Sequence, residues 1–338
     1  MRQLRSYLIL FAAIAGVSVA TVALCKAQTS PAGPVQLVVA FPPGGVGDLV
    51  ARIIADKLAG TLGQSVTVEN RPGGTGAIGA QSIARAAPDG RTLLLGQTPE
   101  IVVHRALVGD VGYLANKDLQ PVALVAVIPL VLTARSDAPY ASVNELLKAA
   151  RASPRGLLFG SGGPGTPGHL AGELLRSRTG ARLSHVPFEG GGPALEGLLN
   201  RRVDFSFPVL LTALPQITAG QAKALAVTSA KRSPALPNVP TLSEAGVKDV
   251  DVSHWVGIFA PAGTPGEMVT KLNQAINQTL AQPEARDRLV GSGAEVTPMS
   301  ADQFAGFVRS EASKYVLLIT REFCSRPLYG GCVGFPTD

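Results

Sequence analysis

The sequence contains few of the side chains that hold metal ions or stack on nucleic acid bases. Four histidines, three cysteines and one tryptophan are spread over 338 residues, and aromatic side chains make up 5%. The histidines show no metal-ligand spacing and two of the cysteines come late in the chain, so no metal site is expected. No stripe of lysine and arginine with interleaved aromatic residues is present, which argues against nucleic acid as a partner.

Charge is also scarce. Charged residues make up 16% of the chain and the formal net charge is +6, which falls to +3 without Arg2, Arg5 and Lys26. So small a net positive charge gives no support to a nucleic-acid-binding function. The hydrophobic fraction of 46% is typical of a globular protein, and the length leaves room for two domains with sizeable cores.

The first 27 residues have the pattern of an export signal. Arg2 and Arg5 precede an apolar run at residues 7–24, and Cys25-Lys26-Ala27 ends it in a small-x-Ala pattern. We predict a cleaved signal peptide over residues 1–27. One alternative is a retained membrane anchor, because the apolar run is long for a signal core. Another is a lipoprotein processed at VALC, although Leu24 is bulkier than the residues usually found there.

Two cysteines remain after such cleavage, Cys324 and Cys332. In an exported protein they could form one local disulfide, which would stabilise the fold by roughly 2–3 kcal/mol. They could equally stay as free thiols in a loose tail, and the sequence leaves both alternatives open.

Strand, loop and helix alternate from Val35 onward, and the same order returns from residue 156. Each half carries two glycine- and proline-rich loops after strands, FPPGGVGD and NRPGGTG in the first, SGGPGTPG and FEGGGP in the second. Short apolar strands joined by helices predict mostly parallel sheets covered by helices on both faces. We predict two α/β lobes, one formed by residues 28–125 and 240–338 and the other by residues 126–239, with two hinge crossings between them.

The four loops predict a binding site for a small anion. In open parallel sheets, ligands bind beyond the carboxyl ends of the strands, where helix N-termini offer free N–H groups. We therefore expect the loops to converge on a cleft between the lobes. A carboxylate is the simplest ligand; phosphate is an alternative, although the GxxxxGK[ST] pattern is absent.

Two motifs in the sequence have some features of a cofactor site or a catalytic site. Gly74, Gly76 and Gly79 have the spacing of a dinucleotide fingerprint, but they follow the second strand and the next strand carries no acid, so no cofactor is expected. Ser161 with His169 or His185 would suit an exported serine hydrolase, but FGSGG lacks the first glycine of GxSxG. Ser161 is expected instead to donate a hydrogen bond to a ligand.

Four long segments occur in order along the chain: VVAFPPGGVGDLVARIIADKL, VTVENRPGGTGAIGAQSIARAAPDGRTLLLG, FGSGGPGTPGHLAGELL and ALAVTSAKRSPALPNVPTLSEAG. Together they resemble the Bug family, extracytoplasmic solute-binding receptors related to the tripartite tricarboxylate transporters. The resemblance covers about residues 35–315. It implies a two-lobed periplasmic binding protein of type II, a "Venus flytrap", that performs no chemistry.

The resemblance also implies partners. A monomer would capture a small organic acid and deliver it to the permease subunits of a tripartite tricarboxylate-type transporter. The alternative within the same fold is a sensor that presents the loaded receptor to a membrane kinase. The serine hydrolase remains the alternative from another class.

Carried over onto this sequence, the resemblance places fifteen residues at the ligand. For Asp48 the alternative is a structural role, in which it caps the next helix or ties the loop down. The residues are Phe41, Pro42, Pro43, Gly44, Gly45, Asp48, Thr98, Ser161, Gly162, Thr166, His169, Phe188, Gly190, Asp204 and Val209.

Two departures from the family pattern carry expectations of their own. Pro208 and Val209 stand where members usually have a polar or acidic residue, which favours a ligand with an apolar or aromatic body. After Tyr315 the chain fits neither the family pattern nor a clean helix, so the last turn of the first lobe is expected to be poorly supported; a frameshifted end is one explanation.

Overall fold

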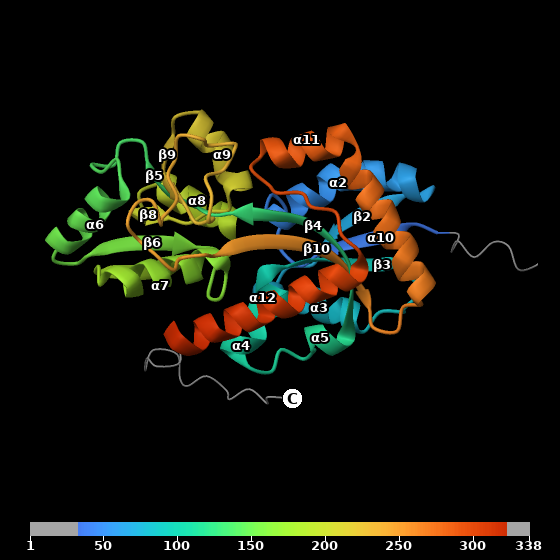
Figure 1. The fold of residues 1–338 in the computed structure, drawn as a ribbon. Coiled ribbons are helices and arrows are strands. Elements are labelled where there is room, and N and C mark those ends of the chain that lie inside the picture. The colour runs from blue at the N-terminus through green and yellow to red at the C-terminus, as the bar shows by residue number, and fades with distance from the viewer. Residues whose placement is uncertain (1–32, 323–338) are drawn as a thin grey trace, which may run out of the picture. The chain divides into compact units, whose positions relative to one another are not determined.

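The computed structural model describes residues 33–322, which form two five-stranded sheets with helices around them (Figure 1). The predicted signal peptide and the pair Cys324 and Cys332 lie outside these residues. The first sheet has the order β2-β1-β3-β10-β4, formed by Val66–Asn70, Val35–Val39, Thr92–Gln97, Ser253–Pro261 and Leu119–Pro129. The second has the order β7-β6-β8-β5-β9, formed by Leu183–Pro187, Leu157–Ser161, Phe205–Ser206, Val131–Arg135 and Ala222–Val227.

The two sheets share one topology. In the first, β1 pairs in parallel with β2 and β3, and β10 runs antiparallel between β3 and β4. In the second, β6 pairs in parallel with β7 and β8, and β5 runs antiparallel between β8 and β9. Four strands of each sheet therefore point the same way and one is reversed. The repeated order agrees with the weak internal repeat of the sequence and with the expected mostly parallel sheets.

The helices differ widely in length. The longest are α2 (Val46–Leu62), α7 (Pro167–Thr179), α10 (Gly266–Ala281) and α12 (Ala301–Glu322). The others are α3 (Ala77–Ala84), α4 (His104–Val108), α5 (Ala115–Asp118), α6 (Val143–Ala152), α8 (Gly191–Leu199), α9 (Leu210–Thr218) and α11 (Pro283–Gly291), with a 3₁₀ turn at Gly74–Gly76 and a π-helical turn at Pro99–Val103. None of the helices in this part of the chain is long and apolar enough to cross a membrane.

Strand β1 shows how the core is built on both faces of the first sheet. Leu37 and Val39 belong to a cluster shared with α2 and α10, whereas Val38 and Ala40 belong to a cluster shared with α3 and α12. Successive strand residues point to opposite faces, so a continuous apolar run is what a strand covered on both sides requires. Figure 1 shows α2 and α10 on one side of this sheet and α3 and α12 on the other.

The chain passes between the sheets twice. It leaves β4 at Pro129 and enters β5 at Val131, and it returns through residues 228–252 into β10. Thr228 joins the two crossings: its hydroxyl accepts from the Leu130 N–H at 3.1 Å and donates to the Val252 carbonyl at 2.6 Å. The predicted lobe boundaries at 125/126 and 239/240 remain predictions.

The end of the described chain corrects one expectation. Residues 316–322 continue α12 instead of breaking it, so the prediction that the helical pattern is lost after Tyr315 is wrong for these residues. Tyr315 and Ile319 are four residues apart and both are fully buried. This spacing places them on one face of the helix, which packs in the core.

Candidate functional site

A cavity of about 380 Å³ lies between the loops of the two sheets. Three loops form most of its wall, those that connect β1 to α2, β6 to α7 and β7 to α8. The ends of β3 and β8 and the start of β10 complete it. The lining residues are Phe41–Val46, Gln97, Pro99, Gly160–Gly162, Thr166–Gly168, Glu189–Ala194, Glu196, Ser206–Val209 and His254.

Four helices begin at this cavity. Their N-cap residues are Gly45 for α2, Thr166 for α7, Gly190 for α8 and Val209 for α9, and all four line the wall. At none of these N-caps does a side chain accept a capping hydrogen bond from the first turn of the helix. The first N–H groups of a helix lack intrahelical partners and carry the positive end of its dipole, so the four ends together favour an anion.

Cationic side chains do not contribute to this wall. No lysine or arginine is among the described residues that line the cavity, and the acidic residues there are Glu189 and Glu196, both solvent-exposed. The groups of the wall that can attract an anion are therefore its backbone N–H groups and helix N-termini.

The side chain of Asp48 holds the first loop in place. The Gly44 N–H donates to Asp48 Oδ2 at 2.9 Å, and Arg52 Nε donates to the same carboxylate at 3.1 Å. Burial acts to raise the pKa of Asp48, but the hydrogen bonds from Arg52 and Gly44 outweigh it and hold the pKa below its usual range. Gly44 has φ +78°, a conformation that favours glycine.

The second loop is held by two histidines, of which His169 is buried and His185 is half-buried. Ser161 Oγ lies 2.7 Å from His185 Nε2, and the Gly165 N–H donates to His169 Nδ1 at 3.1 Å. The two imidazole rings lie 4.2 Å apart, centroid to centroid. Burial lowers the pKa of His169 to about 3 and of His185 to about 4, with nearby charge as a smaller cause, so both rings are neutral at pH 7.

The third loop is anchored by an aromatic ring. Phe188 is 9% exposed and packs with α8, and its N–H donates to the Ser161 carbonyl at 3.0 Å. Arg202 lies over the ring at 4.9 Å from its centroid, within the range of a cation–π contact. Phe188 therefore joins the second and third loops from behind the cavity wall.

The structure brings ten of the fifteen predicted residues to the cavity. They are Phe41, Pro42, Pro43, Gly44, Gly45, Ser161, Gly162, Thr166, Gly190 and Val209. Asp48, His169 and Phe188 stand behind the loops as described above. Thr98 is fully buried and binds the backbone of Trp255, and Asp204 accepts the Leu158 N–H at 2.8 Å. Each of these two side chains fixes neighbouring backbone and neither lines the cavity, so their ligand contacts stay predictions.

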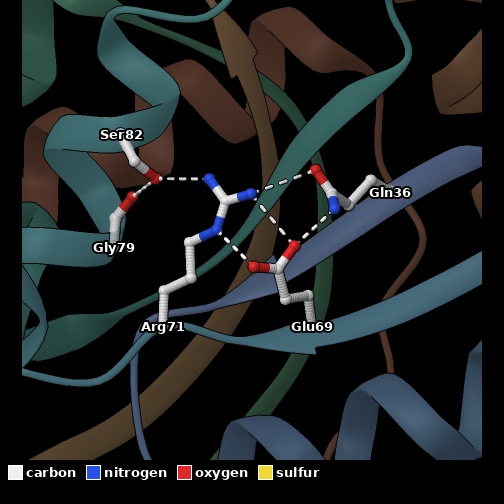
Figure 2. Close-up of polar contacts among 5 residues, drawn as sticks. All are labelled: Gln36, Glu69, Arg71, Gly79 and Ser82. Atoms are coloured by element: carbon white, nitrogen blue, oxygen red, sulfur yellow. Dashed lines mark hydrogen bonds and ion pairs between the residues drawn. The ribbon is translucent and has the colours of Figure 1, made fainter.

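The fourth glycine-rich loop, NRPGGTG, does not reach the cavity wall, contrary to the expectation that all four loops converge there. Figure 2 shows what surrounds it: Arg71 donates to Glu69 and Gln36 on the neighbouring strands and to Ser82 on α3, and Ser82 donates to the Gly79 carbonyl. Gly79 leaves no room for a side chain, because a Cβ there would lie 2.7 Å from Ala40 Cα. Gly79, three residues beyond the loop, therefore serves the close packing of α3 on the end of β1.

Sequence reasoning missed several lining residues. Gln97 and Pro99 flank the predicted Thr98, so their position after a strand was a usable signal. His254 had no local signal, because it reaches the site from 157 residues further along the chain, where its Nε2 lies 3.1 Å from Gln97 Oε1. Ser206 and Phe207 were also missed; Ser206 ends the very short strand β8, and Phe207 directly precedes Pro208.

Two sheets of this shared topology, with a cavity between their loops, define a periplasmic binding protein fold. The model of the tripartite tricarboxylate transporter family receptor matches residues 50–322, and the chain belongs to this family. The Bordetella pertussis protein BugT is 35% identical over 90% of this chain and 94% of its own. The family consists of solute-binding receptors and is not a class of enzymes.

Two solved structures from Rhodopseudomonas palustris are similar to this chain. MatC, solved with bound malate, is 35% identical with a TM-score of 0.80 over 86% of this chain and 99% of its own. A second protein, solved with adipate, is 35% identical with a TM-score of 0.83 over 86% of this chain and 97% of its own.

Proposed function

We propose that this protein captures a small carboxylate-bearing solute between its two sheets and delivers it to a membrane transporter. The observation that carries the proposal is the meeting of four helix N-termini at one cavity, with no cationic side chain among the described residues of its wall. A carboxylate is small enough to accept hydrogen bonds from several of these N–H groups at once, and the positive ends of the helix dipoles favour its negative charge.

The geometry suits capture between two moving parts. The loop before α2 belongs to the first sheet and the loops before α7 and α8 to the second, so a solute that contacts both would hold the sheets together. The two chain crossings joined by Thr228 are the hinge of this proposal. Closure around ligands about such crossings is a common device of two-lobed binding proteins.

The relatives support the same class of solute. Malate and adipate, present in two similar structures, are both organic acids. In this chain Phe207, Pro208 and Val209 line the wall, which supports our expectation of a solute with an apolar or aromatic body. The predicted signal peptide over residues 1–27 and a periplasmic location belong to the same proposal.

A thermal-shift screen of the purified protein against mono-, di- and tricarboxylates and aromatic acids tests the proposal. A bound acid at a hundred times its Kd would add about 2.7 kcal/mol to the free energy of unfolding, a shift of several degrees. The uncharged amide or alcohol of each hit should produce no shift. A folded protein that binds none of these acids, or binds the uncharged analogues equally well, would contradict the proposal.

A charge placed at one helix N-terminus sharpens the test. Gly191 is the first residue of α8, it lines the cavity, and nothing lies within 4 Å of a Cβ built there. Gly191→Asp puts a carboxylate where we expect the solute's carboxylate, so its affinity should fall at least about tenfold. Gly191→Asn has nearly the same shape without the charge and is the matched control.

A further inference from the structure

Three polar side chains of the cavity wall are buried and incompletely hydrogen-bonded. Gln97 at the end of β3, His254 in β10 and Ser206 at the end of β8 are 3%, 5% and 1% exposed. Gln97 Nε2, His254 Nδ1 and Ser206 Oγ are buried atoms with no hydrogen-bond partner among the described residues. Buried polar atoms are normally satisfied by protein, ordered water or ligand, so an unsatisfied set in one cavity wall points to a bound group.

The hydrogen bond between Gln97 and His254 fixes what each side chain offers. Gln97 Oε1 can only accept, so His254 Nε2 carries the proton of this 3.1 Å contact. The His254 ring is neutral, because complete burial lowers its pKa to about 3. Its Nδ1 is therefore an acceptor, whereas Gln97 Nε2 has two N–H groups to donate. The Ser206 hydroxyl can do either.

The position of Gln97 is itself well defined. Its backbone N–H donates to Glu100 Oε1 at 2.7 Å, and a Cβ on Gly47 would lie 2.8 Å from its Nε2. The side chain is thus packed beneath the first turn of α2, next to the first loop. Burial raises the pKa of Glu100 to about 8, so this neighbour is uncharged at pH 7 and adds no charge to the wall.

The charge of the cavity wall limits which group of a solute can bind Gln97, His254 and Ser206. The helix N-termini favour an anion, but no lysine or arginine among the described lining residues adds a full positive charge that would offset a second carboxylate. A second carboxylate would also meet the lone pair of His254 Nδ1. A neutral group that both donates and accepts satisfies Gln97 and His254 together.

We propose that the solute is a monocarboxylate whose far end carries an uncharged group that donates and accepts hydrogen bonds, a hydroxyl or a carboxamide, held by Gln97, His254 and Ser206. This inference rests on the proposed function and narrows its ligand class. It sets this chain apart from the two relatives described with malate and adipate, which are dicarboxylic acids.

Matched acids that differ only at the far end test the proposal by isothermal titration calorimetry. Hexanoate, 6-hydroxyhexanoate, adipate monoamide and adipate form one series, and benzoate, 4-hydroxybenzoate, terephthalate monoamide and terephthalate form another. If the carboxylate screen selects a different skeleton, the same four end groups are compared on that skeleton. We expect the hydroxyl or amide member to bind at least about tenfold more tightly than the plain acid and the diacid.

The outcomes separate the two proposals. If no carboxylate binds, the proposed function fails. If carboxylates bind but the diacid is the tightest, or the plain acid equals the hydroxyl and amide members, only the inference about the far end fails. These comparisons use the unaltered protein and do not depend on whether a variant folds.

Substitution of Gln97 locates the effect. Gln97→Met keeps the size of the side chain but removes both N–H donors, so the preference for the hydroxyl or amide member over the plain acid should fall to about twofold or less. Gln120→Met, at an exposed residue outside the cavity wall, is the matched control and should keep the preference. An unchanged preference in a folded Gln97→Met protein would overturn the assignment.

Discussion

The two sheets have the same strand order, yet their anion loops are fixed in different ways. The loop after β1 is tied by an ionised carboxylate, Asp48, whereas the loop after β6 is tied by the neutral rings of His169 and His185. One topology therefore places both loops at the cavity, and unrelated side chains hold them there. The difference predicts that the two halves of the site respond differently to substitution and to pH.

The largest expected effects come from the glycines at which a helix packs closely on its strand, one in each half of the protein. A Cβ on Gly79 would lie 2.7 Å from the backbone of Ala40 in the first sheet, whereas a Cβ on Gly172 would lie 2.1 Å from the ring of Phe159 in the second. Backbone cannot move aside as a side chain can. We expect Gly79→Ala to lower the free energy of unfolding by about 3 kcal/mol or more and Gly172→Ala by about 1–3 kcal/mol.

Urea denaturation of the two variants measures both values. Gly60→Ala is the control, because this residue lies in α2 with nothing within 4 Å of a built Cβ, and the substitution should stabilise the protein by up to about 1 kcal/mol. A larger loss for Gly172→Ala than for Gly79→Ala would show that the backbone contact is not the stricter one.

The loop anchors give an effect of intermediate size. Asp48→Ala removes an ionised acceptor from the Gly44 N–H, so it should cost about 2 kcal/mol and weaken binding of a carboxylate. Ser161→Ala removes neutral hydrogen bonds to His185 and Gly163 in the other loop and should cost about 1 kcal/mol. Asp48→Asn, which keeps an acceptor without the charge, should lie between wild type and Asp48→Ala in the same denaturation measurement.

Acid should loosen the second loop before the first. His169 and His185 have folded-state pKa values of about 3 and 4, whereas an unfolded histidine titrates near 6.5. The unfolded chain therefore binds protons that the native protein does not, and stability is lost as the pH falls from about 6.5 to about 4. The contribution of Asp48, whose pKa is lowered, persists through this window and is lost below it.

The pH dependence of the unfolding temperature checks this prediction. His254 also has a pKa of about 3 and contributes to the decline in the wild type, so the comparison is with His185→Gln, which removes one titrating ring. Its unfolding temperature should fall less between pH 7 and pH 4.5. Parallel curves for the variant and the wild type would contradict the role assigned to His185.

The local sequence pattern was enough to predict the loops of the site, but not the other residues that complete the cavity wall. The runs FPPGGVGD, SGGPGTPG and FEGGGP come between apolar strands and helices, so their place at strand ends and helix starts followed from sequence, and all three line the cavity. NRPGGTG has the same composition, but its Arg71 is bound to Gln36 on β1 and to Ser82 on α3 (Figure 2). Composition alone cannot separate a loop that faces a ligand from one that packs beneath it.

The sequence by itself determined the two α/β halves, the family, and a site built from backbone N–H groups, because these depend on apolar periodicity and on glycine and proline near strand ends. Only the tertiary structure decided which polar side chains reach that site. His254 meets Gln97 across 157 residues of chain, and Thr98, one position further on, turns instead to the backbone of Trp255. These contacts form because the reversed strand β10 lies beside β3. Pairing between strands that are far apart along the chain produces no periodic pattern in the sequence.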